Sequence, residues 1–257
     1  MVLSTKRVIS VSGKGGTGKT TLTALLTKYL IKNTSEPILV VDADPATNLP
    51  GILGVEIKKT VGEVTDELKR RIASGSIPLM VSKEGLLDSW IFETLIEGDR
   101  FDLLAMGRSE GEGCYCYVNN VLTKILDTLT ENYENTIMDM EAGLEHLSRR
   151  TERDVDIMFI TSDPSKMGLI TAQRIKDLTK EVHINVRKIW LVGNMFPQGL
   201  EETFRASAAT MGLDVAGVIS IDPNVASYNM LGKPLLTLPD DSQSYKTIVD
   251  IAKKAGL

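Results

Sequence analysis

Residues 13–20 read Gly13-Lys14-Gly15-Gly16-Thr17-Gly18-Lys19-Thr20. They match the phosphate-binding P-loop pattern GxxxxGK[ST], with an additional lysine directly after the first glycine. A β-branched run precedes the loop at Arg7–Val11, and an amphipathic helical pattern follows it at Thr21–Leu30. Glycines let the backbone fold tightly, so that several N–H groups point at phosphate oxygens, and a helix N-terminus adds partial positive charge. The stretch therefore predicts a nucleotide site between a strand and a helix.

Two residues of the loop have predicted chemical roles. The ammonium of Lys19 should reach the β and γ phosphates of ATP, and the hydroxyl of Thr20 should hold Mg²⁺. One alternative is a glycine-rich turn that only caps a helix, but the strand–loop–helix context favours the nucleotide site. The residues expected to contact the nucleotide here are Gly13, Lys14, Gly15, Gly16, Thr17, Gly18, Lys19, Thr20 and Thr21.

The composition narrows the classes of protein that fit. The chain has 257 residues, 42% hydrophobic and 25% charged, which is enough for one large core, so we expect a single ATPase domain over residues 1–257. A net charge of −5 argues against a general nucleic-acid binder. No apolar run approaches the ~18 residues of a membrane span. No secretory segment precedes the first strand, so a cytoplasmic protein is expected.

Strand-like and helix-like runs alternate along the chain, which predicts an α/β fold with a mostly parallel, twisted sheet covered by helices on both faces. The expected strands are Arg7–Val11, Ile38–Val41, Phe101–Ala105, Thr136–Met140, Asp156–Thr161, Lys188–Val192 and Val215–Ile219. The expected helices, besides the one after the P-loop, are Val61–Ala73, Val118–Leu129, Lys166–Glu181, Glu201–Met211 and Gln243–Ala255. Residues 56–98 are the least regular part, with an insertion expected near Ile77–Ser82.

Acidic residues follow the second expected strand, in Asp42-Ala43-Asp44-Pro45. Carboxylates at the carboxyl end of a strand face the ligand in a parallel α/β sheet. Asp44 is a candidate to orient the attacking water, and Asp42 a candidate to support Mg²⁺ through a water. The alternative is a capping turn, because Asp-Pro is good turn chemistry. Behind a P-loop, the functional interpretation is favoured.

Two further strand ends carry polar residues. Asp139 ends an apolar run, as in a Walker B strand, and would hold Mg²⁺ indirectly, while the N–H of Gly143 would sense the γ-phosphate. Glu141 is either a general base or a solvated loop carboxylate, and the sequence does not decide between them. Asn194 follows another strand, and its amide would either pair with an adenine edge or serve a turn or cap.

Together these residues resemble the deviant-Walker-A P-loop ATPases, a family that includes MinD, ParA, the nitrogenase iron protein and the arsenite and tail-anchored-protein ATPases. The matching pieces are KGGTGKT at 14–20, DADPATN at 42–48, DMEAG at 139–143 and Asn194, and the resemblance spans nearly the whole chain. Residues 221–226, which contain Pro223, and residues 232–236 resemble the C-terminal nucleotide loop of this family.

The resemblance implies more than the motifs themselves show. In this family the additional lysine, here Lys14, crosses the interface of an ATP-bound homodimer and contacts the phosphates of the partner. The chain departs from the family in one place, because the usual DTPPG of the second switch is replaced by DMEAG at 139–143. That departure leaves the roles of residues 140–142 open.

Both cysteines of the chain lie in one CxC, Cys114-Tyr115-Cys116, just before an expected helix. A disulfide between them would close a small, strained ring, whereas two thiolates suit a soft metal ion. A tetrahedral site needs four ligands, and neither His146 nor His183 is an obvious completion. A symmetric dimer supplies four sulfurs on its axis. The alternative is a pair of ordinary buried, reduced cysteines.

The P-loop with Lys14, the CxC and the stretch from Asp139 to His146 together resemble one branch of the family, the CooC group of nickel-handling ATPases. The resemblance implies ATP and Mg²⁺ as cofactors, Ni²⁺ or Zn²⁺ bound between subunits, and carbon monoxide dehydrogenase as the client metalloenzyme. The net charge of −5 argues against a nucleic-acid partner, and the C-terminal tail has too few cations for a membrane-binding helix, so neither partner is expected.

Two rival functions remain at this stage. A positioning ATPase of the MinD or ParA kind would need a basic amphipathic C-terminal helix or a basic DNA-binding face. The apolar stripe at Tyr245, Ile248, Val249 and Ala252 is more simply a core-facing helix. An ATPase carrying an iron–sulfur cluster would need four thiolates, and the tight CxC spacing counts against it.

Overall fold

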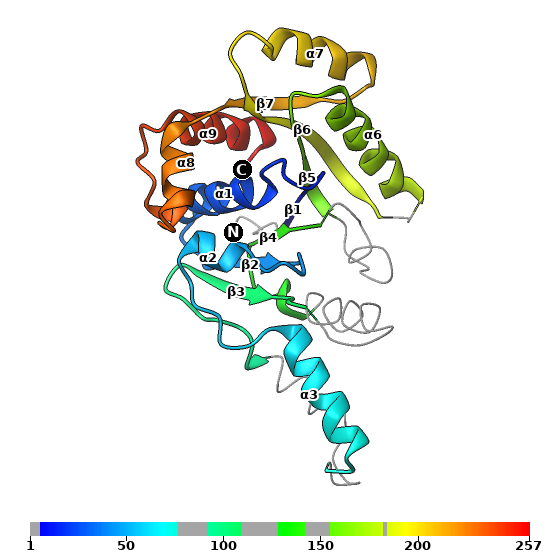
Figure 1. Ribbon diagram of the computed structural model, residues 1–257, viewed down its shortest axis with the longest axis vertical. Coiled ribbons are helices and arrows are strands. Elements are labelled where there is room, and N and C mark those ends of the chain that lie inside the picture. The colour runs from blue at the N-terminus through cyan, green and yellow to red at the C-terminus, as the bar shows by residue number, and fades with distance from the viewer. Residues whose placement is uncertain (1–5, 77–91, 109–127, 142–154, 182–183) are drawn as a thin grey trace, which may run out of the picture.

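A parallel sheet organises the computed structural model, which describes residues 6–76, 92–108, 128–141, 155–181 and 184–257. Within these residues seven strands pair in the order β3-β2-β4-β1-β5-β6-β7, and every ladder between them is parallel (Figure 1). The strands are β1 (Arg7–Gly13), β2 (Ile38–Asp42), β3 (Phe101–Ala105), β4 (Asn135–Asp139), β5 (Val155–Ser162), β6 (Val186–Phe196) and β7 (Val215–Ser220). The expected α/β architecture is confirmed.

Helices cover both faces of the sheet (Figure 1). Those described are α1 (Lys19–Asn33), α2 (Leu49–Leu53), α3 (Val61–Ala73), α6 (Lys166–Glu181), α7 (Glu201–Thr210), α8 (Pro223–Met230) and α9 (Gln243–Ala255), with a 3₁₀ helix, η1, at Leu235–Thr237. One buried cluster joins a face of the sheet to α1 and α9, and the other joins the opposite face to α3, α6 and α7. Each strand is therefore covered on both sides, as its continuous apolar sequence requires.

Most predicted elements are found, and the differences lie at their ends. The ranges predicted for α3, α6 and α9 are correct, and α7 ends one residue early. β6 runs on to Phe196 instead of ending at Val192, because its ladder with β7 continues past a register shift between Gly193 and Phe196. The sequence analysis missed α2 and α8, which are short. Only residues 128 and 129 of the helix predicted at Val118–Leu129 are described, and both are helical. The insertion predicted at Ile77–Ser82 lies outside the described residues.

The C-terminal helix packs into the core. Tyr245, Ile248 and Ala252 on the apolar stripe of α9 are buried, and Val249 is partly buried. The hydroxyl of Tyr29 in α1 donates to the backbone oxygen of Leu257 at 3.0 Å and ties the last residue to the same layer. The stripe is core-facing, as predicted, so this face of α9 is not exposed to a lipid surface. No helix among the residues that the structure describes has the length and apolar character needed to span a bilayer.

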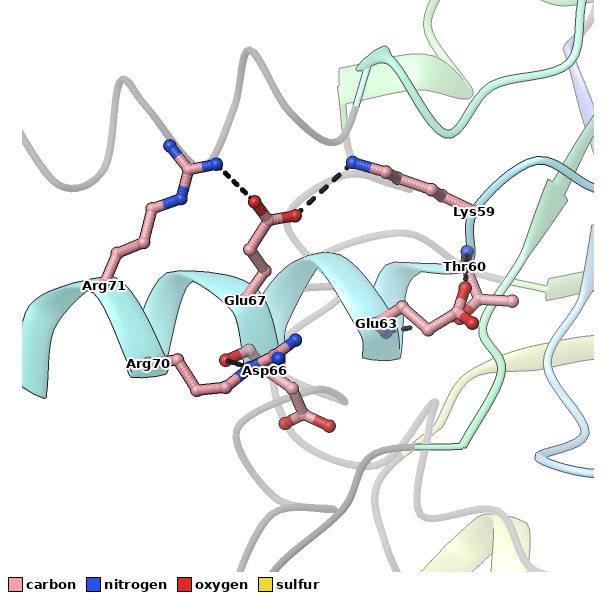
Figure 2. A network of polar contacts seen from close by, with 7 residues as sticks. All are labelled: Lys59, Thr60, Glu63, Asp66, Glu67, Arg70 and Arg71. Atoms are coloured by element: carbon pink, nitrogen blue, oxygen red, sulfur yellow. Dashed lines mark hydrogen bonds and ion pairs between the residues drawn. The ribbon is translucent and has the colours of Figure 1, made fainter. Parts of the chain in front are cut away.

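Helix α3 begins beside the carboxyl end of β3 and extends away from the sheet (Figure 1). A capping box starts it: the backbone N–H of Glu63 donates to the hydroxyl of Thr60, and the backbone N–H of Thr60 donates back to Glu63. Glu67 forms ion pairs with Lys59 and Arg71 on the outer side of the helix (Figure 2). These outer contacts are exposed and contribute little to stability, so the buried face and the cap hold α3 in place.

Candidate nucleotide-binding site

The P-loop lies at the carboxyl edge of the sheet, between β1 and α1, and the side chain of Asn194 holds it in place. Gly18 adopts φ +83°, and a Cβ there would lie 2.1 Å from Nδ2 of Asn194, so only glycine fits. The amide of Asn194 donates to the backbone oxygen of Thr17 at 2.9 Å. The irregular end of β6 next to Asn194 directs this side chain towards the loop. Its predicted contact with adenine stays a prediction, and the structure adds a bracing role that the sequence analysis did not identify.

A pair of threonines closes the other side of the loop. The hydroxyl of Thr17 lies 2.7 Å from the backbone oxygen of Lys14 and 2.6 Å from the hydroxyl of Thr161 at the end of β5. A Cβ at Gly13 would lie 2.2 Å from the same Thr161 hydroxyl, so β1 and β5 approach closely here. Thr17, predicted to contact the nucleotide, therefore faces the interior, where it fixes the shape of the loop.

Lys19, Thr20 and Asp139 meet behind the loop. Lys19 is 8% exposed and Asp139 only 1%. Burial raises the pKa of Asp139 to about 6, while the Thr20 hydroxyl and the Lys19 charge act in the opposite direction. Oδ1 of Asp139 is buried and has no hydrogen-bond partner in the described part of the chain. A buried carboxylate oxygen without a donor, beside the hydroxyl of Thr20, suits Mg²⁺ and one of its waters.

Asp42 lies opposite Asp139 in the register of β2 and β4, and its carboxylate organises the loop that follows. Oδ1 accepts the N–H of Asp44 at 3.1 Å, and Oδ2 accepts the N–H of Leu49 at 3.0 Å. Burial, then the charge of Asp139, raises the pKa of Asp42 to about 7, although these two N–H groups lower it. Asp42 was predicted to support Mg²⁺ through a water. The geometry shows that its first task is to hold the turn that carries Asp44.

The raised pKa values of this carboxyl pair link stability to pH. Both values lie above the 3.8 of an ordinary aspartate. The contribution of the two carboxyls to folding is therefore full below about pH 3.8 and is lost as the pH rises through about 6 and 7. A divalent cation at the site would neutralise the pair at higher pH.

Asp44 is partly exposed and lines a pocket of about 630 Å³ that opens over the P-loop. Its Oδ1 also accepts the N–H of Ala46 at 2.9 Å, so Asp44 shapes the turn and also lines the pocket, while its role in orienting the attacking water stays a prediction. The volume is typical of a small-molecule site. The pocket is lined by Gly15, Gly16, Gly18, Lys19, Thr20, Thr21, Asp44, Asn48, Gly51, Ile52, Tyr228, Asn229, Gly232 and Lys233.

The sequence analysis did not name the residues that form one wall of this pocket. Tyr228 and Asn229 of α8, with Gly232 and Lys233 after it, face the P-loop side. Pro223, the residue predicted in this segment, is not part of the lining and instead starts α8. The preceding residue, Asp222, caps the helix by accepting the N–H of Asn224 at 2.8 Å. The signal available in the sequence was the Gly232-Lys233 pair, which the resemblance had placed in a nucleotide loop without assigning a contact.

Some of the remaining predicted residues are described by the structure, and the others lie outside the described ranges. The side chain of Lys14 is 47% exposed, its Nζ lies 3.6 Å from Asp163, and it is not part of the pocket lining, so its predicted contact with a partner's phosphates stays a prediction. Glu141 is exposed. Cys114, Cys116, Gly143, His146 and His183 lie outside the described residues. Within the described ranges, no group of three or more His, Cys, Asp or Glu side chains is arranged to hold a metal ion. Mg²⁺ at this site would therefore need phosphate oxygens and waters to complete its shell.

Comparison with known proteins identifies the family to which this site belongs. The model of the CobQ/CobB/MinD/ParA nucleotide-binding domain matches residues 8–235. The chain belongs to this family. Membership makes it a P-loop ATPase. An uncharacterized ATP-binding protein of Methanocaldococcus jannaschii is 48% identical over 96% of this chain and 97% of its own length. The carbon monoxide dehydrogenase accessory protein CooC of Rhodospirillum rubrum is 27% identical over 87% of each chain.

A solved structure shows the same fold. The septum site-determining protein MinD of Pyrococcus horikoshii, in complex with Mg-ADP, superposes with a TM-score of 0.69 over 97% of this chain and 95% of its own. At 21% identity this likeness supports the fold alone.

Replacing Asp44 with asparagine is expected to leave nucleotide affinity intact and to slow ATP hydrolysis about 100-fold or more. The phosphate contacts survive, and only the orientation of the attacking water is lost. Calorimetric binding of ATP and steady-state phosphate release measure the two effects. Asp250→Asn on the exposed side of α9 is the matched control and should change neither. An equal loss of binding in the Asp44 variant would contradict the role.

Proposed function

We propose that the protein is a dimeric ATPase that couples ATP binding and hydrolysis to the delivery of a soft metal ion, Ni²⁺ or Zn²⁺, into a client metalloenzyme such as carbon monoxide dehydrogenase. The observation that carries this proposal is the Cys114-Tyr115-Cys116 pair in a chain of this ATPase family. Two thiolates per chain become four in a symmetric dimer, which is the number that a tetrahedral soft-metal site takes. The metal is cargo in this scheme, whereas ATP and Mg²⁺ are cofactors.

Two further observations support the proposal. The similarity to CooC extends over most of both chains instead of being confined to the P-loop. The chain also enters the segment that carries the cysteines directly from the nucleotide site, because Met106, one residue beyond β3, donates its N–H to the backbone oxygen of Asp42 at 2.8 Å. A shift of the Asp42 turn on nucleotide binding would therefore act on the start of that segment.

In the proposed dimer, Lys14 joins the two chains through the bound nucleotide. Its exposed ammonium would leave Asp163 and contact the phosphates bound by the partner chain, which makes the dimer depend on ATP. The exposed pair with Asp163 is weak enough to exchange for a phosphate contact. The buried apolar stripe of α9 argues against the membrane-positioning rival, because that stripe is the surface such a helix would need.

The proposal predicts that one metal ion binds per two chains. Ni²⁺ or Zn²⁺ is titrated anaerobically into reduced, metal-depleted protein while light scattering follows the mass. The mass should double and binding should saturate at one metal per dimer, even without nucleotide, because the ion binds only the dimer. Mg²⁺ at the same concentration is the control and should leave the mass unchanged, since thiolates bind hard ions poorly.

Two results would contradict this function. Saturation at one metal per chain with no change in mass would rule out the bridging site. A brown protein with a visible absorption band that is lost on iron chelation would favour the iron–sulfur rival.

A further inference from the structure

The nucleotide pocket has two walls that come from opposite ends of the chain. The P-loop and the first turn of α1 form one wall, and the end of α8 with the turn after it forms the other. Lys19 belongs to the first wall and Lys233 to the second, while Asp44 is the one carboxylate in the lining. The described lining therefore carries two cations and one anion, which favours an anionic ligand that spans both walls.

The backbone around Lys233 is held in place from several sides. The N–H of Lys233 donates to the backbone oxygen of Tyr228 at 2.9 Å, and Gly232 reverses the chain at φ +61°. The hydroxyl of Tyr228 donates to the backbone oxygen of Thr237 at 3.2 Å, which fixes its ring. The neighbouring Pro234 packs against Gly54, where a Cβ would lie 2.4 Å from its Cγ. The turn is thus a fixed support.

The side chain of Lys233 is not committed to a carboxylate. Its Nζ lies 5.7 Å from the centroid of the Tyr228 ring, and no ion pair within the described residues includes it. Each of the two P-loop lysines has an anionic neighbour: Lys14 pairs with Asp163, and Lys19 lies close enough to Asp139 to affect its pKa. An exposed ammonium that lines a pocket and has only an aromatic ring beside it can turn towards an incoming phosphate at small cost.

We propose that Lys233 is a nucleotide-contacting residue that binds the phosphate chain of ATP from the side opposite Lys19. The bound nucleotide then joins the C-terminal turn to the P-loop and to the Asp44 segment, so that three distant parts of the sequence share one ligand. The inference rests on the ATP binding of the proposed function and adds a contact that the P-loop motif does not contain.

Lys233→Gln tests the inference through affinity. Calorimetric titration with a slowly hydrolysed ATP analogue, ADP and adenosine, each with Mg²⁺, should show roughly tenfold weaker binding of the phosphate-bearing ligands, the lower range for a lost charge-assisted hydrogen bond. Adenosine binding should not change. Lys233→Arg should restore most of the affinity, because it keeps the charge. Lys246→Gln on the exposed side of α9 changes the net charge equally and should have no effect.

Three outcomes would overturn the inference. The first is wild-type affinity of Lys233→Gln for the ATP analogue and ADP. The second is an equal loss for adenosine. The third is a lowered unfolding temperature of the ligand-free variant that Lys233→Arg does not restore, which would indicate a structural role. None of them affects the proposed function, which fails separately if the wild-type protein binds no ATP or binds one metal per chain.

Discussion

Lys19→Ala is expected to abolish ATP hydrolysis, with a loss of about 1,000-fold or more. Lys19 is the buried lysine of the P-loop, and the motif predicts that its ammonium reaches the β and γ phosphates, where charge develops during hydrolysis. A buried charge that is already in place interacts more strongly with an anion than an exposed one does. Alanine leaves a gap that water can fill, but water cannot supply the positive charge.

The same substitution should also weaken the Mg²⁺ site. Burial raises the pKa of Asp139 to about 6 even though the charge of Lys19 acts to lower it. Without that charge the pKa rises further, so more of Asp139 is protonated near neutral pH and less of it can hold a hydrated cation. The residual activity of Lys19→Ala should therefore need a higher pH or more Mg²⁺ than the wild-type protein needs.

Phosphate release at saturating ATP, measured from pH 6 to 9 at two Mg²⁺ concentrations, checks both effects. Lys246→Ala is the control for the loss of one lysine charge and should behave as the wild-type protein. The thermal unfolding of Lys19→Ala should show that it is folded. More than about a tenth of the wild-type rate in a folded variant would mean that another cation carries out the reaction.

The sequence predicted the parts of this site that depend on local chemistry. The P-loop forms a recognisable pattern because its glycines let the backbone approach phosphate closely, while Lys19 supplies an ammonium and Thr20 a hydroxyl at fixed places. Asp139 was singled out because it ends a buried strand, and Asp44 because it lies two residues beyond another, where a carboxylate faces the ligand side of a parallel sheet. The strands themselves were found because they are continuous apolar runs, and both faces of the sheet bury them.

The contacts that the sequence did not predict join residues that are far apart along the chain. The bond from Asn194 to Thr17 spans 177 residues, and only the folded sheet brings the two together. The bonds from Asp42 to the N–H groups of Asp44 and Leu49 depend on the shape of one turn, and a sequence pattern does not specify it. Tyr228 was missed because a helix of eight residues has too few turns for a clear period, and the segment that holds Lys233 was noticed only through the resemblance, which assigned it no contact.

Replacing Cys114 and Cys116 together with alanine is expected to remove metal binding and metal-driven dimerisation completely. The proposed site takes all its protein ligands from this pair in the two chains, so a double substitution removes all four sulfurs of the dimer, and none remain to hold the ion at the ~2.3 Å of a zinc–sulfur bond. Binding of ATP by the monomer should survive, because Lys19, Thr20 and the rest of the P-loop are unchanged. Metal analysis after dialysis, light scattering with Ni²⁺ or Zn²⁺, and calorimetry with an ATP analogue measure the three properties.

The coupling between the two sites gives the sharpest form of this test. If ATP changes the affinity of the wild-type dimer for metal by some factor, then metal must change the affinity for ATP by the same factor. In the double alanine variant, added metal should leave the affinity for ATP unchanged, because no metal binds to this variant. Tyr115→Phe keeps both thiols and is the matched control, which should retain metal, dimerisation and coupling. A double alanine variant that still doubles its mass on addition of Ni²⁺ or Zn²⁺ would show that the metal acts elsewhere, and the CxC would then be a structural pair in an ATPase with another task.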